Sequence, residues 1–169
     1  MVSGHSKQVT KQIGEYLVAA ELCRRDLIAT TFTGNVPNYD ILAADPRGSH
    51  LAIQVKAINR GQWQFDATKF VEIEFDGKRQ VVGKNTHPPY PGLICVLVAL
   101  ASYGHDRFFI LEWSDLQRAI ASKYRRRLKD LGGVRPRKPG SFHTAIALSD
   151  ISSFQDNWGL IPKRLKVGV

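Results

Sequence analysis

The stretch LAIQVKAIN, residues 51–59, decides the predicted fold because it has the pattern of a buried β-strand. Side chains alternate between the two faces of a strand, so the odd-numbered positions form one apolar face. Gln54 and Lys56 fall on the other face, inside a strand that is otherwise apolar. Burying a lysine without a partner is costly. The second face is therefore either exposed to water or opposite an anionic group.

The preceding segment YDILAAD, residues 39–45, has the composition of a second strand and ends in the turn sequence DPRGS. Two strands joined by so short a turn are expected to be antiparallel neighbours. In that arrangement Asp40 approaches Gln54 and Lys56 on the same face. An acid at the end of one strand would then stand beside a Gln-X-Lys sequence on the next.

These residues predict a divalent-metal site. Asp40 supplies a carboxylate, Gln54 an amide oxygen and Val55 a backbone carbonyl, and Mg²⁺ prefers such oxygens. A second carboxylate is expected from the helix predicted over residues 6–25, where Glu15 follows a glycine. Lys56 would stand beside the attacking water, where it can orient the water or help to deprotonate it. The alternative is that all four side chains are ordinary strand, turn and helix residues.

The rest of the chain predicts alternating helices and strands in one domain over residues 1–169. The helix at 6–25 shows an apolar stripe of Val9, Ile13, Tyr16, Leu17, Ala20 and Cys23. A second helix is expected at 114–131, with Ser114 and Gln117 as a capping box. Further strands are predicted at 27–33, 62–66, 93–101, 107–113 and 142–148, with a hairpin at 70–83 that turns at Asp76-Gly77.

Charge indicates a polyanionic partner, because the net charge is +9 and the pI about 9.8. The basic helix and loop at 114–140 hold most of the excess. We expect phosphate contacts there from Arg125, Arg126, Arg127, Arg135, Arg137 and Lys138. The alternative is a solvated helix face followed by a flexible loop.

Hydropathy predicts no membrane span, since no apolar run reaches the length that a spanning helix needs. The N-terminal segment lacks the apolar core of a secretory signal. Cys23 and Cys95 are expected to be buried thiols rather than a disulfide or a metal pair. Together these features favour a cytoplasmic protein.

The segments GEYLVAAEL, NYDILAAD and LAIQVKAINRGQWQF resemble the PD-(D/E)XK nuclease superfamily, whose fold is restriction-endonuclease-like. The Gln-X-Lys variant is similar to group I intron homing endonucleases and, more distantly, to Holliday-junction resolvases. The resemblance implies an α/β fold with a central mixed β-sheet flanked by helices. It implies Mg²⁺- or Mn²⁺-dependent hydrolysis of DNA phosphodiesters by Asp40, Gln54, Lys56 and Glu15. No proline directly precedes Asp40, and Gln54 replaces the second acid of the motif.

Three hypotheses of function follow from the sequence. The first is a metal-dependent DNA endonuclease, for which cutting both strands favours a homodimer or a higher symmetric oligomer. The second is a catalytically inactive nucleic-acid-binding domain with the same fold, in which Gln54 marks a decayed metal site. The third is a structural module whose basic helix docks on an acidic protein. DNA is the expected partner, with RNA and branched DNA left open.

Overall fold

The structure is a computed structural model, and it describes residues 7–32 and 38–167. The predicted start of the first helix at residue 6 and the predicted strand end at residue 33 lie outside these ranges. The elements in chain order are α1 Lys7–Cys23, β1 Ile28–Thr31, β2 Ile41–Ala44, β3 His50–Ile58, β4 Trp63–Asp66, η1 Ala67–Lys69, β5 Val71–Asp76, β6 Arg79–Asn85, β7 Ile94–Ala99, β8 Arg107–Glu112, α2 Trp113–Asp130, β9 His143–Ile146, η2 Leu148–Asp150, η3 Ser152–Phe154 and α3 Leu160–Val167.

A five-stranded sheet with the strand order β1-β2-β3-β7-β8 forms the centre of the fold. The β3 and β7 strands run parallel, whereas the other neighbouring pairs are antiparallel, so the sheet is mixed. The predicted antiparallel pairing of β2 with β3 is confirmed, with Ile41 opposite Ile53. Asp45 closes the turn between them, because its Oδ1 accepts the N–H groups of Arg47 and Ser49.

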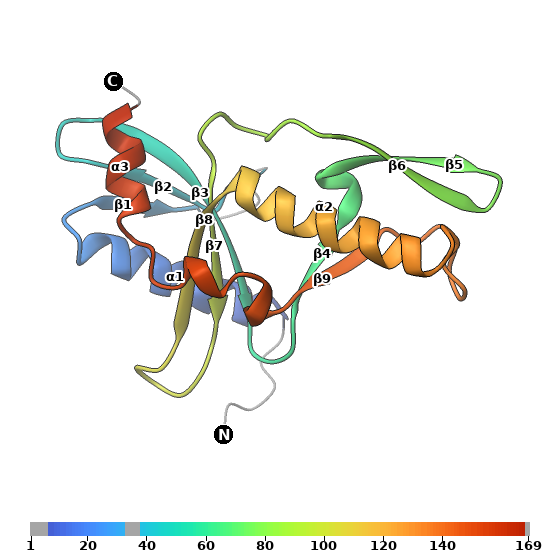
Figure 1. Cartoon of the computed structure of the whole chain (residues 1–169). Coiled ribbons are helices and arrows are strands. Elements are labelled where there is room, and N and C mark those ends of the chain that lie inside the picture. The colour runs from blue at the N-terminus through green and yellow to red at the C-terminus, as the bar shows by residue number, and fades with distance from the viewer. Residues whose placement is uncertain (1–6, 33–37, 168–169) are drawn as a thin grey trace.

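The two faces of the sheet pack against different elements (Figure 1). On one face, Ile53 and Val55 of β3 join an apolar cluster with residues of α1 and α3. On the other face, the first half of α2 packs with β4 and β9 over β7 and β8. The expected α/β fold, with a central mixed sheet flanked by helices, is confirmed. The even-numbered side chains of β3, including Gln54 and Lys56, therefore face the α2 layer.

The apolar stripe predicted for the first helix is wrong by one position. The buried residues of α1 are Thr10, Gly14, Val18 and Leu22, whereas Val9 and Tyr16 are 40 % and 55 % exposed. The reason is a close approach of α1 to β3, which favours the side of the helix that carries its smallest residue. Cys23 is consequently exposed, although both cysteines are free thiols as expected. Burial raises the pKa of Cys95 to about 12, which makes that thiol unreactive.

Gly14→Ala is expected to lower the melting temperature, although alanine is the better helix former by about 1 kcal/mol. A Cβ at residue 14 would lie 2.5 Å from the Cβ of Ala57. Moving α1 away from β3 to relieve that overlap should cost about 1–3 kcal/mol. The control is Gly140→Ala, where the added Cβ meets no atom within 4 Å. Equal melting temperatures for the two variants in a thermal melt would contradict this contact.

The predicted hairpin lies away from the central sheet, beside the second half of α2 (Figure 1). β5 and β6 pair as expected and pack on the second half of α2 through the buried Tyr124 and Leu128. The predicted capping box is wrong, because α2 begins at Trp113, one residue before Ser114. Gln117 is instead buried and donates from Nε2 to the carbonyl oxygens of Phe70 and Thr86.

Candidate metal and nucleic-acid site

Asp40 lies directly before β2, and its hydrogen bonds link the start of that strand to β3. Its backbone N–H donates to the carbonyl of Ile53 at 2.9 Å. Its carboxylate Oδ2 then accepts the N–H of Val55 at 2.8 Å, so the side chain continues the hydrogen bonding where the β2 register ends. This places the carboxylate beside the Gln54–Lys56 segment and fixes its orientation. The second oxygen, Oδ1, remains available for other partners.

A lysine from α1 connects Asp40 with Glu15. Lys11 Nζ lies 2.9 Å from Glu15 Oε1 and 3.1 Å from Asp40 Oδ1, while the two carboxylate side chains are only 13 % and 14 % exposed. Contact with Glu15 is the main reason that the pKa of Lys11 is raised above its usual 10.5; burial opposes this effect, and Asp40 adds to it. The structure thus brings the two predicted acids to one place, with a cation between them.

Gln54 and Lys56 lie on the same face of β3 and differ in what they contact. Within the described part of the chain the Gln54 amide has no hydrogen-bond partner, so both its oxygen and its nitrogen are available. The Lys56 Nζ lies 5.2 Å from the centre of the Phe65 ring. Burial lowers the pKa of Lys56, and the charge of Lys69 lowers it further, against the raising effect of Asp40. A lysine in this setting gives up its proton more readily than a free one.

These groups line one cleft of about 420 Å³, whose lining includes Asp40, Gln54, Val55 and Lys56. Glu15 is not among the lining residues and reaches the site through Lys11, which also lines the cleft. Sequence reasoning missed Lys11, although its spacing of four residues from Glu15 is the ordinary spacing of a helical ion pair. It also missed the other charged lining residues, which are Asp66 and Lys69.

The donor set is chemically suited to a hard divalent cation. In residues 7–32 and 38–167 no three His, Cys, Asp or Glu side chains gather into a ligand cluster. The candidate set is instead two carboxylates, the free Gln54 amide and the Val55 carbonyl, all of them oxygen donors of the kind that Mg²⁺ prefers. Glu15 Oε1 is buried and has only the ion pair with Lys11, without an aligned hydrogen bond.

The basic helix and loop predicted to contact phosphates lie outside this cleft. Five of the six named residues are exposed: Arg125, Arg126, Arg127, Arg137 and Lys138. The Arg125 guanidinium donates to the carbonyl of Gly83 and to Asn85 Oδ1, so part of its function is to hold the hairpin against α2. None of the six lines the cleft around Asp40.

Arg135 is a correction to the prediction of phosphate contacts. Its side chain is 7 % exposed, and its two terminal nitrogens donate to the carbonyls of Ser141 and His143. The guanidinium also lies 5.8 Å from the centre of the Tyr124 ring. Its hydrogen bonds are used to fold the loop after α2 back onto the helix. A charge count along the sequence could not separate this buried arginine from its exposed neighbours.

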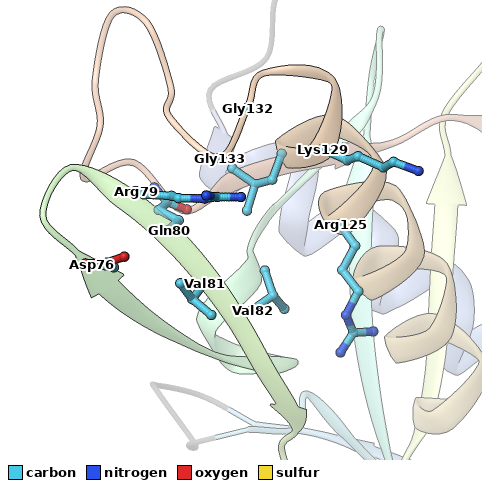
Figure 2. A pocket seen from close by; sticks show the side chains of 10 residues that line it. Asp76, Arg79, Gln80, Val81, Val82, Arg125, Lys129, Gly132 and Gly133 are labelled. Carbon is cyan, nitrogen blue, oxygen red and sulfur yellow. The ribbon is translucent and has the colours of Figure 1, made fainter.

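A second pocket, of about 400 Å³, lies between the hairpin and the C-terminal half of α2. Figure 2 shows Arg79 from β6 beside the Gly132-Gly133 turn, with Arg125 and Lys129 projecting from α2. Gly133 has a φ of +86°, and a Cβ there would lie 2.6 Å from Arg79 Cγ, so glycine is required for this approach. The lining of this pocket includes one acid, Asp76, and one amide, Gln80. Unlike the Gln54 amide, the Gln80 amide is already used, because its Nε2 donates to the carbonyl oxygens of Pro139 and Ser141.

The fold is that of a known nuclease. Over 96 % of this chain and 97 % of the other, the structure is similar to a bacterial homing endonuclease, I-Ssp6803I, with a TM-score of 0.54 and 15 % sequence identity. At this identity the likeness establishes the fold. No family model and no curated protein matches the sequence. None of the helices in the described ranges is long and apolar enough to cross a membrane.

Proposed function

We propose that this protein is a metal-dependent DNA endonuclease that hydrolyses phosphodiester bonds at the cleft around Asp40. The observation that carries the proposal is the ion-pair geometry of Asp40 and Glu15, which stand on either side of Lys11 next to the free amide of Gln54. Such an arrangement on a homing-endonuclease fold supports nuclease chemistry. The PD-(D/E)XK resemblance in its Gln-X-Lys form assigns the same residues.

Each residue of the site has a distinct role in this proposal. Asp40, Glu15, Gln54 and the Val55 carbonyl would hold Mg²⁺ or Mn²⁺, which activates water and offsets the charge of the scissile phosphate. Lys56 would orient the attacking water, and its neutral form, which the lowered pKa makes more accessible, would accept the proton of that water. A bound ion would displace Lys11 from the two carboxylates, and its ammonium group would then be free to contact the substrate.

DNA is the proposed partner, and duplex cutting favours a homodimer or a higher symmetric oligomer, because each strand needs its own site. The test of function is incubation with supercoiled, linear, branched and single-stranded DNA and with RNA, each with Mg²⁺, Mn²⁺ or EDTA. Nicking or linearisation that EDTA abolishes is the expected result. Absence of cleavage on every substrate with both metals would refute the enzymatic proposal.

Gln54→Glu is expected to increase the gain in melting temperature that Mg²⁺ produces, because a carboxylate holds a cation more tightly than an amide. Bound ligand stabilises the folded state by an amount that grows with affinity. Without metal, the variant should be less stable than wild type, since the new charge lies near Asp40. The control is Gln64→Glu, which makes the same change elsewhere in the same cleft. Thermal melts across a Mg²⁺ series would contradict a metal role for Gln54 if both variants responded alike.

A second candidate is a catalytically inactive nucleic-acid-binding domain. The observation in its favour is that Lys11 already supplies a cation to both carboxylates, while Gln54 contributes no charge of its own. A site that had lost its metal could be maintained in this form by the ion pairs. DNA binding with no effect of Mg²⁺ or Mn²⁺ on stability would favour this candidate.

A further inference from the structure

A groove of about 660 Å³ adjoins the cleft and carries positive charge only. It is formed by the first turns of α1, the second half of β3 and the connection from β3 to β4. Its charged lining residues are Lys7, Lys11, Lys56 and Arg60, and the lining contains no aspartate or glutamate. The remaining polar lining residues include the amides Asn59, Gln62 and Gln64. A groove with this composition fits a polyanionic ligand.

The charges of Lys7 and Arg60 are available to such a ligand. Both side chains are exposed, and neither forms an ion pair within the described residues. Lys7 precedes Lys11 by four residues, so both project from the same side of α1. Arg60 lies in the turn after β3, where Gly61 has a φ of +81°. Among the described residues, the groove thus has one unpaired cation on α1 and one in the turn after β3.

The groove and the cleft are continuous, because both are lined by Lys11, Val55, Lys56 and Gln64. A nucleic-acid strand in the groove would therefore lead directly to the carboxylates of Asp40 and Glu15. We propose that this groove binds the phosphates next to the scissile bond, with Lys7 and Arg60 as their main contacts. This inference rests on the proposed nuclease function and gives it a substrate path that the charge pattern of the sequence did not indicate.

The basic surface of α2 is the competing path, and the structure favours the groove over it. The pocket in Figure 2 contains Asp76 as well as its cations, and Arg125 beside it already donates to the hairpin. That pocket also lies at the C-terminal end of α2, where the helix carbonyls make the potential more negative. The lining of the groove contains no acid, and unlike the α2 pocket the groove shares lining residues with the cleft.

The experiment compares two double variants of the full chain in binding to a labelled DNA duplex, with EDTA present to prevent cleavage. Lys7→Gln with Arg60→Gln removes two charges from the groove. Arg126→Gln with Arg127→Gln removes two charges from the α2 surface, so the change in net charge is the same. All four positions are exposed, and a thermal melt of each variant serves to check that it is folded. Affinity is measured across a series of KCl concentrations.

The groove pair of substitutions, Lys7→Gln with Arg60→Gln, is expected to reduce the slope of log affinity against log salt by about 1.8. The reason is that each phosphate contact on duplex DNA contributes about 0.9 to that slope. The α2 pair should reduce the slope by less. An unchanged slope for the groove pair, or an equal reduction in both pairs, would overturn the proposed path while wild-type binding and cleavage remain. If wild type shows neither DNA binding nor cleavage, the proposed function fails together with the path.

Discussion

Asp40→Asn is expected to abolish metal-dependent cleavage while leaving the fold intact. Asparagine keeps an oxygen that can accept the Val55 N–H, which Asp40 Oδ2 accepts in the wild type. It removes the negative charge that would hold the cation. Loss of an outer partner of a metal site already costs up to about 100-fold in affinity or activity, so loss of a charged ligand should cost at least that. The partly exposed ion pair with Lys11 adds at most about 1 kcal/mol to stability.

The measurements are cleavage rate, Mn²⁺ affinity by calorimetry and melting temperature. Asp130→Asn is the matched control, because it removes the same charge from the exposed end of α2. We expect Asp130→Asn to cleave and bind Mn²⁺ as wild type does. Cleavage by Asp40→Asn within a few fold of wild type would place the metal site elsewhere in the chain. A large loss of melting temperature would instead show that the fold needs the charge of Asp40 for its ion pair with Lys11.

The parts of the fold that were predictable are those set by local patterns. Strand alternation over residues 51–58, the DPRGS turn and the hairpin at 70–83 each depend on neighbouring residues, and each is confirmed. The hairpin turns at Gly77-Lys78, one residue later than predicted, because Asp76 still pairs with Arg79. The buried face of α1 was not predictable from hydropathy, because it is chosen by a contact over a long sequence distance. Gly14 can approach Ala57 only because it has no side chain. A search for apolar residues at helical spacing gives no weight to a glycine, so it does not find this contact.

The candidate site, too, was predictable only in part. The approach of Asp40 to Gln54 and Lys56 follows from the short connection between β2 and β3, and it was expected from the sequence. The position of Lys11 was missed, because a search for metal ligands gives no reason to include a cation. Two carboxylates held close together repel each other, and an ammonium group between them relieves that repulsion. The proposed metal ion would therefore have to displace Lys11 from both carboxylates.

Lys56→Met is expected to slow cleavage strongly and at the same time to raise the melting temperature at neutral pH. Burial and the charge of Lys69 disfavour the protonated Lys56 in the folded state, so its pKa is lowered. Methionine removes that cost, and its thioether can pack against Phe65, over which the Lys56 ammonium lies. If Lys56 is the proton acceptor, its loss should slow cleavage by about 100- to 10,000-fold.

The stabilising effect of Lys56→Met should depend on pH in a defined direction. Wild-type Lys56 loses its proton in the folded chain at a lower pH than in the unfolded chain, whose lysine has a pKa near 10.5. Between those values the unfolded state binds more protons, so wild-type stability rises with pH and the advantage of methionine shrinks. The control is Lys84→Met on the exposed hairpin, which should change neither cleavage nor the pH profile. A melting temperature below wild type at neutral pH would show that the Lys56 ammonium stabilises the fold. It would also mean that burial is outweighed there by the attraction of Asp40.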